Sequence, residues 1–263
     1  MLSDRLEMII SSCDKYSDLW DLHVLHLNKY WADRTIKSTI VTDEETSRTF
    51  SNVEVFSAGS SLEMPQRIKK KLETVSSEYV LITLDDYFIT QKVNNEEINR
   101  LIEAMDKYGL DYIRMFPIPT EKVPLDKKMK LYWVDLSRNY AVNLYPGIWR
   151  KSFLKMTLND SLNAWKYEVS LTTIAKENNQ KCAMSRGNEF VFLDVIRKGK
   201  LLSKASKYLR NNDMTIDREV ISKREEAKLK LMFWIKKNTP RFVQSVIKKI
   251  MSLFGMDFYS DGI

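Results

Sequence analysis

The chain has 263 residues, of which 44% are hydrophobic and 29% charged, and its net charge is +7. This composition is typical of a globular protein with a sizeable core and excludes an intrinsically disordered chain. The seven glycines are too far apart to form a G-x-G motif, which excludes a dinucleotide fingerprint and a Walker loop. Two cysteines and two histidines exclude a disulfide framework and a Cys/His zinc site. If this chain binds a nucleotide, a metal ion is the obvious substitute for a Gly-rich phosphate loop.

The positive charge is concentrated near the end of the sequence. Residues 223–249 contain nine Lys and Arg against two Glu, and this excess of seven equals the net charge of the whole chain. The uneven distribution argues against a protein that binds nucleic acid over its whole surface. It predicts a local electrostatic contact made by the C-terminal segment.

Strands and helices are predicted to alternate in the first part of the chain. Short apolar runs predict strands at 6–12, 38–43, 52–57 and 79–84, and helical patterns occupy 18–31 and 64–75. Alternation at this spacing implies a mostly parallel α/β sheet flanked by helices. Ligands bind outside the carboxyl ends of such strands, so one rim should gather Ser11, Ser12, Asp14, Thr42, Asp43, Asp85 and Asp86.

The later part of the chain is less regular. We predict a helix at 94–107, a strand at 111–116 and a loop at 120–130. Residues 131–134 and 141–144 are predicted to form a strand pair, followed by a helix at 151–158 and a strand at 190–194. We place the catalytic domain at 1–205 and a helical C-terminal extension at 206–263.

Asp85 and Asp86 are adjacent carboxylates that follow the most strand-like segment of the sequence. Burying them unpaired would cost several kcal/mol. A divalent cation that bridges them to a diphosphate removes this cost, because Mg²⁺ and Mn²⁺ prefer carboxylate and phosphate oxygens. The alternative is a structural turn in which one Asp accepts hydrogen bonds from backbone amides.

Residues 79–88, YVLITLDDYF, resemble the D-x-D region of GT-A glycosyltransferases, in the form common among bacterial capsule, exopolysaccharide and lipopolysaccharide gene products. Residues 11–14 with Tyr16 and Trp20 resemble the first strand and loop of that family, and Thr42-Asp43 its second nucleotide-facing turn. Residues 145–149 and 163–168 resemble its acceptor-side segment, which contains a W-x-x-E string. The resemblance covers roughly residues 6–200, although adjacent aspartates replace the usual D-x-D spacing.

The resemblance implies transfer of a sugar from a nucleotide-diphosphate donor, a UDP-sugar first of all, to a hydroxyl of a glycan or lipid-linked acceptor in bacterial surface polysaccharide synthesis. It implies that Asp14 and Asp43 contact the nucleoside, and that Asp86, with or without Asp85, binds Mn²⁺ or Mg²⁺. It makes Glu168 the catalytic base of an inverting reaction, because one carboxylate must take the proton of the attacking hydroxyl. The acceptor-side residues it implies are Trp165, Tyr145 and Trp149.

Two of these assignments have structural alternatives. Trp165 and Glu168 could be a packing Trp beside a solvated Glu rather than a sugar platform beside a base. Arg114 ends a predicted strand, where it either stabilises a phosphate or forms a plain salt bridge.

The C-terminal segment predicts a basic amphipathic helix with aromatic residues on its apolar side, a pattern that suits an anionic membrane surface. The residues predicted to contact the membrane are Trp234, Lys236, Lys237, Arg241, Lys248 and Lys249. The alternative is a helix pair that covers the catalytic domain or forms a dimer. The sequence shows no signal peptide and no long apolar span, so we expect a cytoplasmic protein on the inner face of the cell membrane.

Two other functions are compatible with parts of the sequence. A sugar-nucleotide nucleotidyltransferase also uses metal-binding carboxylates on an α/β sheet, but it usually has a Gly-rich phosphate loop near the N-terminus. A non-catalytic membrane or nucleic-acid binder would rely on the basic segment alone. We expect no nucleic-acid partner, because an acidic rim without a metal repels phosphate.

Overall fold

The computed structural model describes residues 2–158, 162–228 and 231. Contacts divide the chain into two compact units, Met1–Asp194 and Val195–Ile263, which are described separately. The predicted domain boundary after residue 205 stays a prediction.

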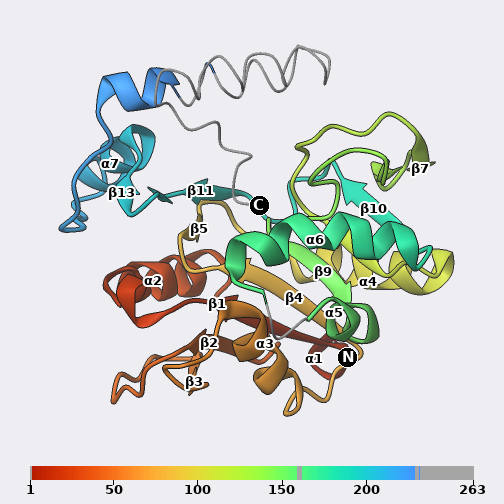
Figure 1. The fold of residues 1–263 in the computed structure, drawn as a ribbon, viewed down its shortest axis with the longest axis horizontal. Helices are drawn as coiled ribbons and strands as arrows, with labels where there is room; N and C mark the ends of the chain where they lie inside the picture. The colour runs from red at the N-terminus through yellow and green to blue at the C-terminus, as the bar shows by residue number, and fades with distance from the viewer. Residues whose placement is uncertain (1, 159–161, 229–230, 232–263) are drawn as a thin grey trace. The chain divides into compact units, whose positions relative to one another are not determined.

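The first unit is built on a nine-stranded sheet with the order β3-β2-β1-β4-β9-β6-β10-β8-β7 (Figure 1). Four strands at one side run parallel: β1 (Leu6–Ser11), β2 (Ser38–Thr42), β3 (Glu54–Ser57) and β4 (Tyr79–Leu84). The antiparallel strand β9 (Gly147–Arg150) separates β4 from β6 (Tyr112–Arg114), which pairs in parallel with β10 (Cys182–Ser185). Two short antiparallel strands, β8 (Leu131–Trp133) and β7 (Pro124–Asp126), complete the far edge. The predicted α/β class with a mostly parallel sheet is confirmed.

The central strands are buried on both faces, which is why they appear in the sequence as continuous apolar runs. Every residue of β1 and β2 is buried. Successive side chains point to opposite faces, so Met8 and Ile10 belong to one core cluster and Ile9 to the other.

Helices cover both faces of the sheet. The first core cluster contains apolar residues of α2 (Trp20–Tyr30) and α4 (Asn95–Tyr108), and the second contains those of α3 (Met64–Leu72), α5 (Lys151–Thr157) and α6 (Ala164–Glu177). A one-turn helix α1 (Leu2–Arg5) precedes β1, and the 3₁₀ helix η1 (Asp14–Leu19) leads into α2. Gly109 caps the C-terminus of α4 in a left-handed conformation, with a φ of 61°, which glycine adopts without strain because it has no Cβ.

Two further strands of the first unit form a small separate sheet, in which β5 (Tyr87–Ile89) pairs antiparallel with β11 (Phe192–Asp194). The second unit contains the hairpin of β12 (Ile196–Arg197) and β13 (Lys200–Leu201) and the helix α7 (Ser203–Arg210). In the part of the chain that the structure describes, no helix has the length and apolarity needed to cross a bilayer.

Two predictions for the region 120–144 were wrong. Residues 120–130 contain strand β7, and residues 141–144 are not a strand, since β8 pairs with β7 and β10 instead. Tyr140 has a φ of 56°, which interrupts an extended chain, and the buried backbone that follows it bonds to side chains rather than to a strand. Strands β9 and β10 and helix α6 were not predicted from the sequence.

Candidate functional site

The carboxyl ends of β1, β2 and β4 meet at one rim of the sheet, because these strands are parallel and adjacent. Backbone bonds continue past the strand ends: the Ser12 amide donates to Val41 O at 2.9 Å, and the Asp85 amide donates to Ser11 O at 3.3 Å. Ser11 and Thr42 are buried strand residues at this rim. The rim therefore gathers the predicted residues of the three strands, Ser11, Ser12, Asp14, Thr42, Asp43, Asp85 and Asp86.

Asp85 orders the connection between β4 and β5. Asp85 is 6% exposed, and its carboxylate accepts a short hydrogen bond from Ser12 Oγ, which in turn accepts a bond of 2.7 Å from Trp20 Nε1. His23 Nδ1 donates to the Asp85 carbonyl at 3.0 Å, and burial lowers the pKa of His23 to about 4, so this imidazole is neutral. Asp85 thus tethers the turn to β1 and α2.

Asp86 is the second residue of this two-residue turn and is only half-buried. Since β4 ends at Leu84, the two carboxylates do not have to point to opposite faces of a strand. The carboxylate of Asp85 bonds to Ser12, and Asp86 is the more exposed residue of the pair.

Asp43 connects the end of β2 to the loop after β1. Its Oδ1 accepts bonds from the amides of Asp14 at 2.6 Å and Glu44 at 3.0 Å and from the Thr42 hydroxyl at 3.1 Å. Partial burial tends to raise the pKa of Asp43, but these hydrogen bonds outweigh it and hold the pKa below its usual value. Asp14 itself is exposed and contributes its amide to this contact.

Arg67, on α3, adds a cation to the rim that the sequence analysis did not single out. Its guanidinium lies 3.9 Å from Asp43 Oδ2 and donates to Leu62 O at 2.6 Å. Its Nε is buried and has no hydrogen-bond partner among the described residues. Positive charge from Arg67 also tends to lower the pKa of Cys13, although burial and the charges of Asp85 and Asp43 raise it overall. In the sequence, the only indication of this role is that Arg67 is a single Arg beside three lysines in the predicted helix 64–75.

Tyr87 is the buried first residue of β5, and the charges of three carboxylates act on its hydroxyl. Burial raises the pKa of its hydroxyl well above the usual value, and the negative charges of Asp86, Asp194 and Glu168 raise it further. Asp194 pairs directly with Tyr87 in the β5–β11 ladder, and sequence analysis did not identify it. The segment after the β4 turn therefore brings Asp86, Asp194 and Glu168 into one electrostatic environment.

Glu168 reaches this environment from α6. The helix begins after Asn163, whose side chain accepts a bond of 3.0 Å from the Lys166 amide, so Trp165 and Glu168 share one helix face. Trp165 is 36% exposed, and the half-buried Glu168 accepts a bond of 3.4 Å from the Leu144 amide. This arrangement places an exposed aromatic side chain one helical turn from a carboxylate that bonds to the segment before β9.

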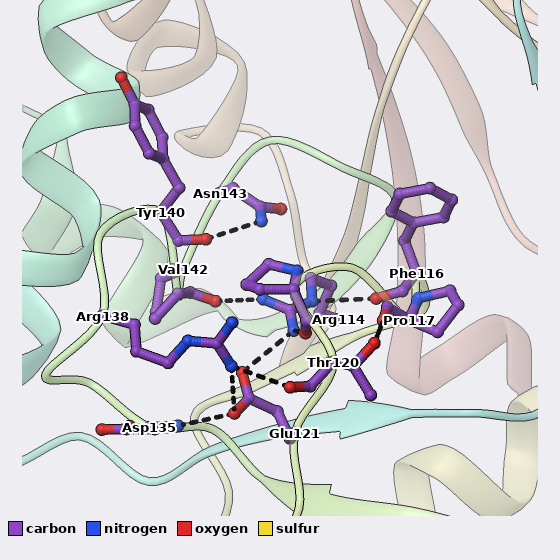
Figure 2. Close-up of polar contacts among 12 residues, drawn as sticks. Arg114, Phe116, Pro117, Thr120, Glu121, Asp135, Arg138, Tyr140, Val142 and Asn143 are labelled. Atoms are coloured by element: carbon purple, nitrogen blue, oxygen red, sulfur yellow. Dashed lines mark hydrogen bonds and ion pairs between the residues drawn. The ribbon is translucent and has the colours of Figure 1, made fainter. Parts of the chain in front are cut away.

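Arg114 is a structural residue, and its predicted contact with phosphate was wrong (Figure 2). Its side chain is 0% exposed and donates to three carbonyls, Phe116 O at 2.9 Å, Ala141 O at 2.5 Å and Pro119 O at 2.5 Å. Its ion pair with Glu121, at 3.3 Å, corresponds to the salt-bridge alternative. These bonds occupy the guanidinium within the chain, so the residue is not available to a ligand.

Trp149 is also misplaced as an acceptor contact. It is 0% exposed and packs in the second core cluster against Tyr112, with ring centroids 4.3 Å apart. Gly147, two residues earlier, allows this packing because a Cβ there would lie 2.8 Å from the Tyr112 ring. Tyr145 remains half-buried near Tyr87, with ring centroids 5.9 Å apart.

The remaining predictions concern the metal and the tail. Among the described residues, no group of three His, Cys, Asp or Glu side chains is arranged to hold a metal ion. The predicted membrane contacts, Trp234, Lys236, Lys237, Arg241, Lys248 and Lys249, lie outside the described residues.

Comparison with known proteins gives structural likeness only. No protein-family model matches, and no curated protein sequence is similar. Among solved structures, S. aureus TarS 1–349 in complex with UDP matches with a TM-score of 0.50 and 17% identity, over 71% of this chain and 59% of that one. The fold is GT-A-like. S. aureus TarS 1–349 in complex with UDP-GlcNAc matches with a TM-score of 0.47 and 18% identity, over 75% of this chain and 60% of that one. The bifunctional IspDF from Campylobacter jejuni matches with a TM-score of 0.43 and 16% identity, over 72% of this chain and 52% of that one.

At these identities the likeness extends to the fold and no further. The chain also spans less than two thirds of the TarS fragment, so part of that structure has no counterpart in it.

Proposed function

We propose that this protein is a glycosyltransferase that moves a sugar from a nucleotide-diphosphate donor to a hydroxyl of a glycan or lipid-linked acceptor. The observation that carries the proposal is the convergence at one rim of three strand ends that are joined by their own polar residues. Ser12 joins β1 to the Asp85 turn, and the Asp14 amide joins the same loop to Asp43. In sheets of this kind such a rim is where ligands bind.

The donor nucleotide is assigned to the β1–β2 side of the rim. Hydrogen bonds lower the pKa of Asp43 and keep its carboxylate ionised. The ionised carboxylate can accept hydrogen bonds from the ribose hydroxyls or the base of a nucleotide. The guanidinium of Arg67 lies beside it and supplies positive charge toward the diphosphate. UDP-sugars are the first donors to test, because the TarS structure of the same fold contains UDP.

The rim offers the carboxylates of Asp85 and Asp86 as ligands for a divalent cation, Mn²⁺ or Mg²⁺. Mg²⁺ in phosphate sites is typically held by one or two carboxylates together with substrate phosphates and water, so a three-residue cage is not required. Asp86 is the better-suited ligand, since Ser12 already engages the carboxylate of Asp85. When bound, the cation would neutralise charge on the departing diphosphate.

Glu168 is the proposed base. The acceptor oxygen attacks the anomeric carbon, the bond from that carbon to the diphosphate oxygen breaks, and Glu168 takes the proton of the attacking hydroxyl. The Leu144 amide holds one carboxylate oxygen of Glu168, which fixes its orientation. A single base of this kind favours inversion at the anomeric carbon.

The test is thermal stability with UDP, GDP or CMP, each with and without Mn²⁺. We expect one nucleoside diphosphate to raise Tm only with Mn²⁺, and we expect Asp86→Ala to lose that response. Asp33→Ala, at an exposed acid on the loop before β2, is the matched control and should respond as the parent does. A shift with RNA but with no nucleotide would contradict the proposal, and pyrophosphate release from a nucleoside triphosphate would favour a nucleotidyltransferase.

The wider setting, bacterial surface polysaccharide synthesis at the inner face of the membrane, belongs to the same proposal. It is supported by the charge pattern of residues 223–249, which matches a membrane-surface helix.

A further inference from the structure

Helix α2 carries three buried polar rings on one face, and we call them the α2 polar face: Trp20, His23 and His26. They are spaced three residues apart, so they lie on the same side of the helix. Their exposed fractions are 1%, 3% and 0%. His23 and His26 are also the only two histidines in the sequence. Burying a polar ring costs stability unless its N–H finds an acceptor, so this face needs matching acceptors in the segment packed against it.

The two imidazoles bond to the main chain on either side of Asp86. His23 Nδ1 donates to the carbonyl of Asp85 at 3.0 Å, and His26 Nδ1 donates to the carbonyl of Ile89 at 2.8 Å. Because a carbonyl oxygen only accepts hydrogen bonds, each imidazole carries a proton on Nδ1. These two bonds fix the backbone immediately before Asp86 and at the end of β5, so the residues between them are held at both ends from one helix.

The α2 polar face also fixes side chains of the same segment. Trp20 Nε1 donates to Ser12 Oγ at 2.7 Å, and Ser12 Oγ in turn donates to the carboxylate of Asp85. Phe88, the central residue of β5, is 0% exposed and packs against both imidazoles, with ring centroids 5.9 and 5.2 Å apart. Helix α2 therefore holds residues 85–89 through main-chain carbonyls, a carboxylate and an aromatic ring.

These contacts order the turn and leave the carboxylate of Asp86 out of the bonds to α2. A buried hydrogen bond adds little net free energy, so apolar side chains on this face would stabilise the fold about as well. What hydrogen-bonded buried groups add is one defined geometry. A ligand-binding carboxylate needs such a geometry, because the groups around it determine its orientation and its affinity. The α2 polar face supplies that geometry to the turn that contains Asp86.

We propose that His23 and His26 are positioning residues of the donor site, which hold the β4–β5 turn so that the carboxylate of Asp86 is oriented for Mn²⁺-dependent binding of the donor diphosphate. This inference rests on the proposed glycosyltransferase function. It gives helix α2 a part in donor binding although its three polar rings are buried. Both imidazoles act through main-chain carbonyls, so the Nδ1 donor of each ring is the group that matters.

The experiment is calorimetric titration of UDP into the full chain with and without Mn²⁺, at a temperature where every variant is folded. His23→Gln and His26→Gln lose the donor at the Nδ1 position and should weaken Mn²⁺-dependent UDP binding about 10–100-fold. His23→Asn and His26→Asn keep an N–H donor at that position and should restore the parent affinity. Val24→Ala is the matched control, because it removes buried methyl groups from the same helix and no hydrogen bond. It should lower Tm and leave UDP affinity unchanged.

Hydrogen–deuterium exchange of peptides that cover residues 85–89 measures the order of the turn without any ligand. Exchange should be faster in both Gln variants than in the parent and the Asn variants. Unchanged UDP affinity in the Gln variants overturns the inference even if exchange is faster, because the α2 polar face would then serve stability alone. Equal weakening of UDP binding in Val24→Ala also overturns it. Both results leave the proposed function standing, whereas a parent protein that never binds UDP contradicts that function and the positioning role together.

Discussion

Replacing Arg114 separates a structural role from a ligand-binding one. The sequence placed this residue at a strand end, where either a phosphate or a salt bridge was possible. In the structure its guanidinium is fully buried, pairs with the 2%-exposed Glu121 and donates to three backbone carbonyls. Arg114→Met keeps much of the volume and removes every one of these bonds.

The expected loss of stability is large. Removing one partner of a buried ion pair costs about 3–5 kcal/mol, because the remaining charge is left uncompensated. For a domain of this size, 1 kcal/mol shifts Tm by about 2–4 °C, so we expect Arg114→Met to melt roughly 6–20 °C below the parent. Arg138 offers a matched control, since it pairs with the same Glu121 but is 42% exposed. Arg138→Met should cost less than about 1 kcal/mol.

The assay is thermal unfolding followed by circular dichroism, together with the UDP response of each variant. Folded Arg114→Met protein should still bind UDP, because the guanidinium does not reach the rim. A variant that melts within about 2 °C of the parent but no longer binds UDP would refute the structural assignment and restore the phosphate role.

Three further predictions concern the rim and the tail. Ser12→Ala removes the hydroxyl between Trp20 and Asp85 and should cost about 1–3 kcal/mol in urea unfolding, whereas Ser11→Ala should change little; equal effects would count against the tether. The pKa of His23 is about 4 in the folded protein against 6.5 in the unfolded chain, so folding stability is lost as the pH falls from 6.5 toward 4, by about 2 kcal/mol at pH 5. His23→Gln should flatten this dependence of stability on pH. A parent Tm that is constant between pH 7 and 5 would contradict a buried neutral imidazole. Replacing Lys236, Lys237, Lys248 and Lys249 with Ser should abolish flotation with anionic liposomes, and unchanged flotation would exclude the electrostatic membrane contact.

The parallel half of the fold was predictable because its strands are buried on both faces. The runs at 6–12, 38–43 and 79–84 are rich in large apolar and β-branched residues, and polar residues follow at the end of each strand. Their parallel order then places Ser12, Asp43 and Asp85 at one rim without knowledge of any side-chain contact.

The antiparallel half was harder to predict for a physical reason. Strand β9 enters the sheet between β4 and β6, a non-local pairing that no local pattern encodes. Residues 141–144 have the composition of a strand, but their backbone groups bond to Arg114 and Thr172. Trp149 and Tyr145 are only four residues apart, but Trp149 lies in the buried strand β9 and Tyr145 precedes it.

The structure shows contacts of Asp85 that the sequence could not, and these bear on the division of roles between the two adjacent aspartates. Ser12 and His23 both bond to Asp85, so its part in ordering the turn has direct support. The proposed metal role of Asp86 rests on its position in the same turn and on its greater exposure than Asp85.

Calorimetric titration of UDP into the protein, with and without Mn²⁺, tests the central proposal most directly. For the parent protein and the Asp33→Asn control we expect binding that tightens at least tenfold, about 1.4 kcal/mol, when Mn²⁺ is present. Asp86→Asn should bind UDP with the same weak affinity in both conditions. Equal Mn²⁺ dependence in Asp86→Asn and the parent, or no UDP binding by the parent in either condition, would contradict a metal-assisted nucleotide-sugar site at this rim.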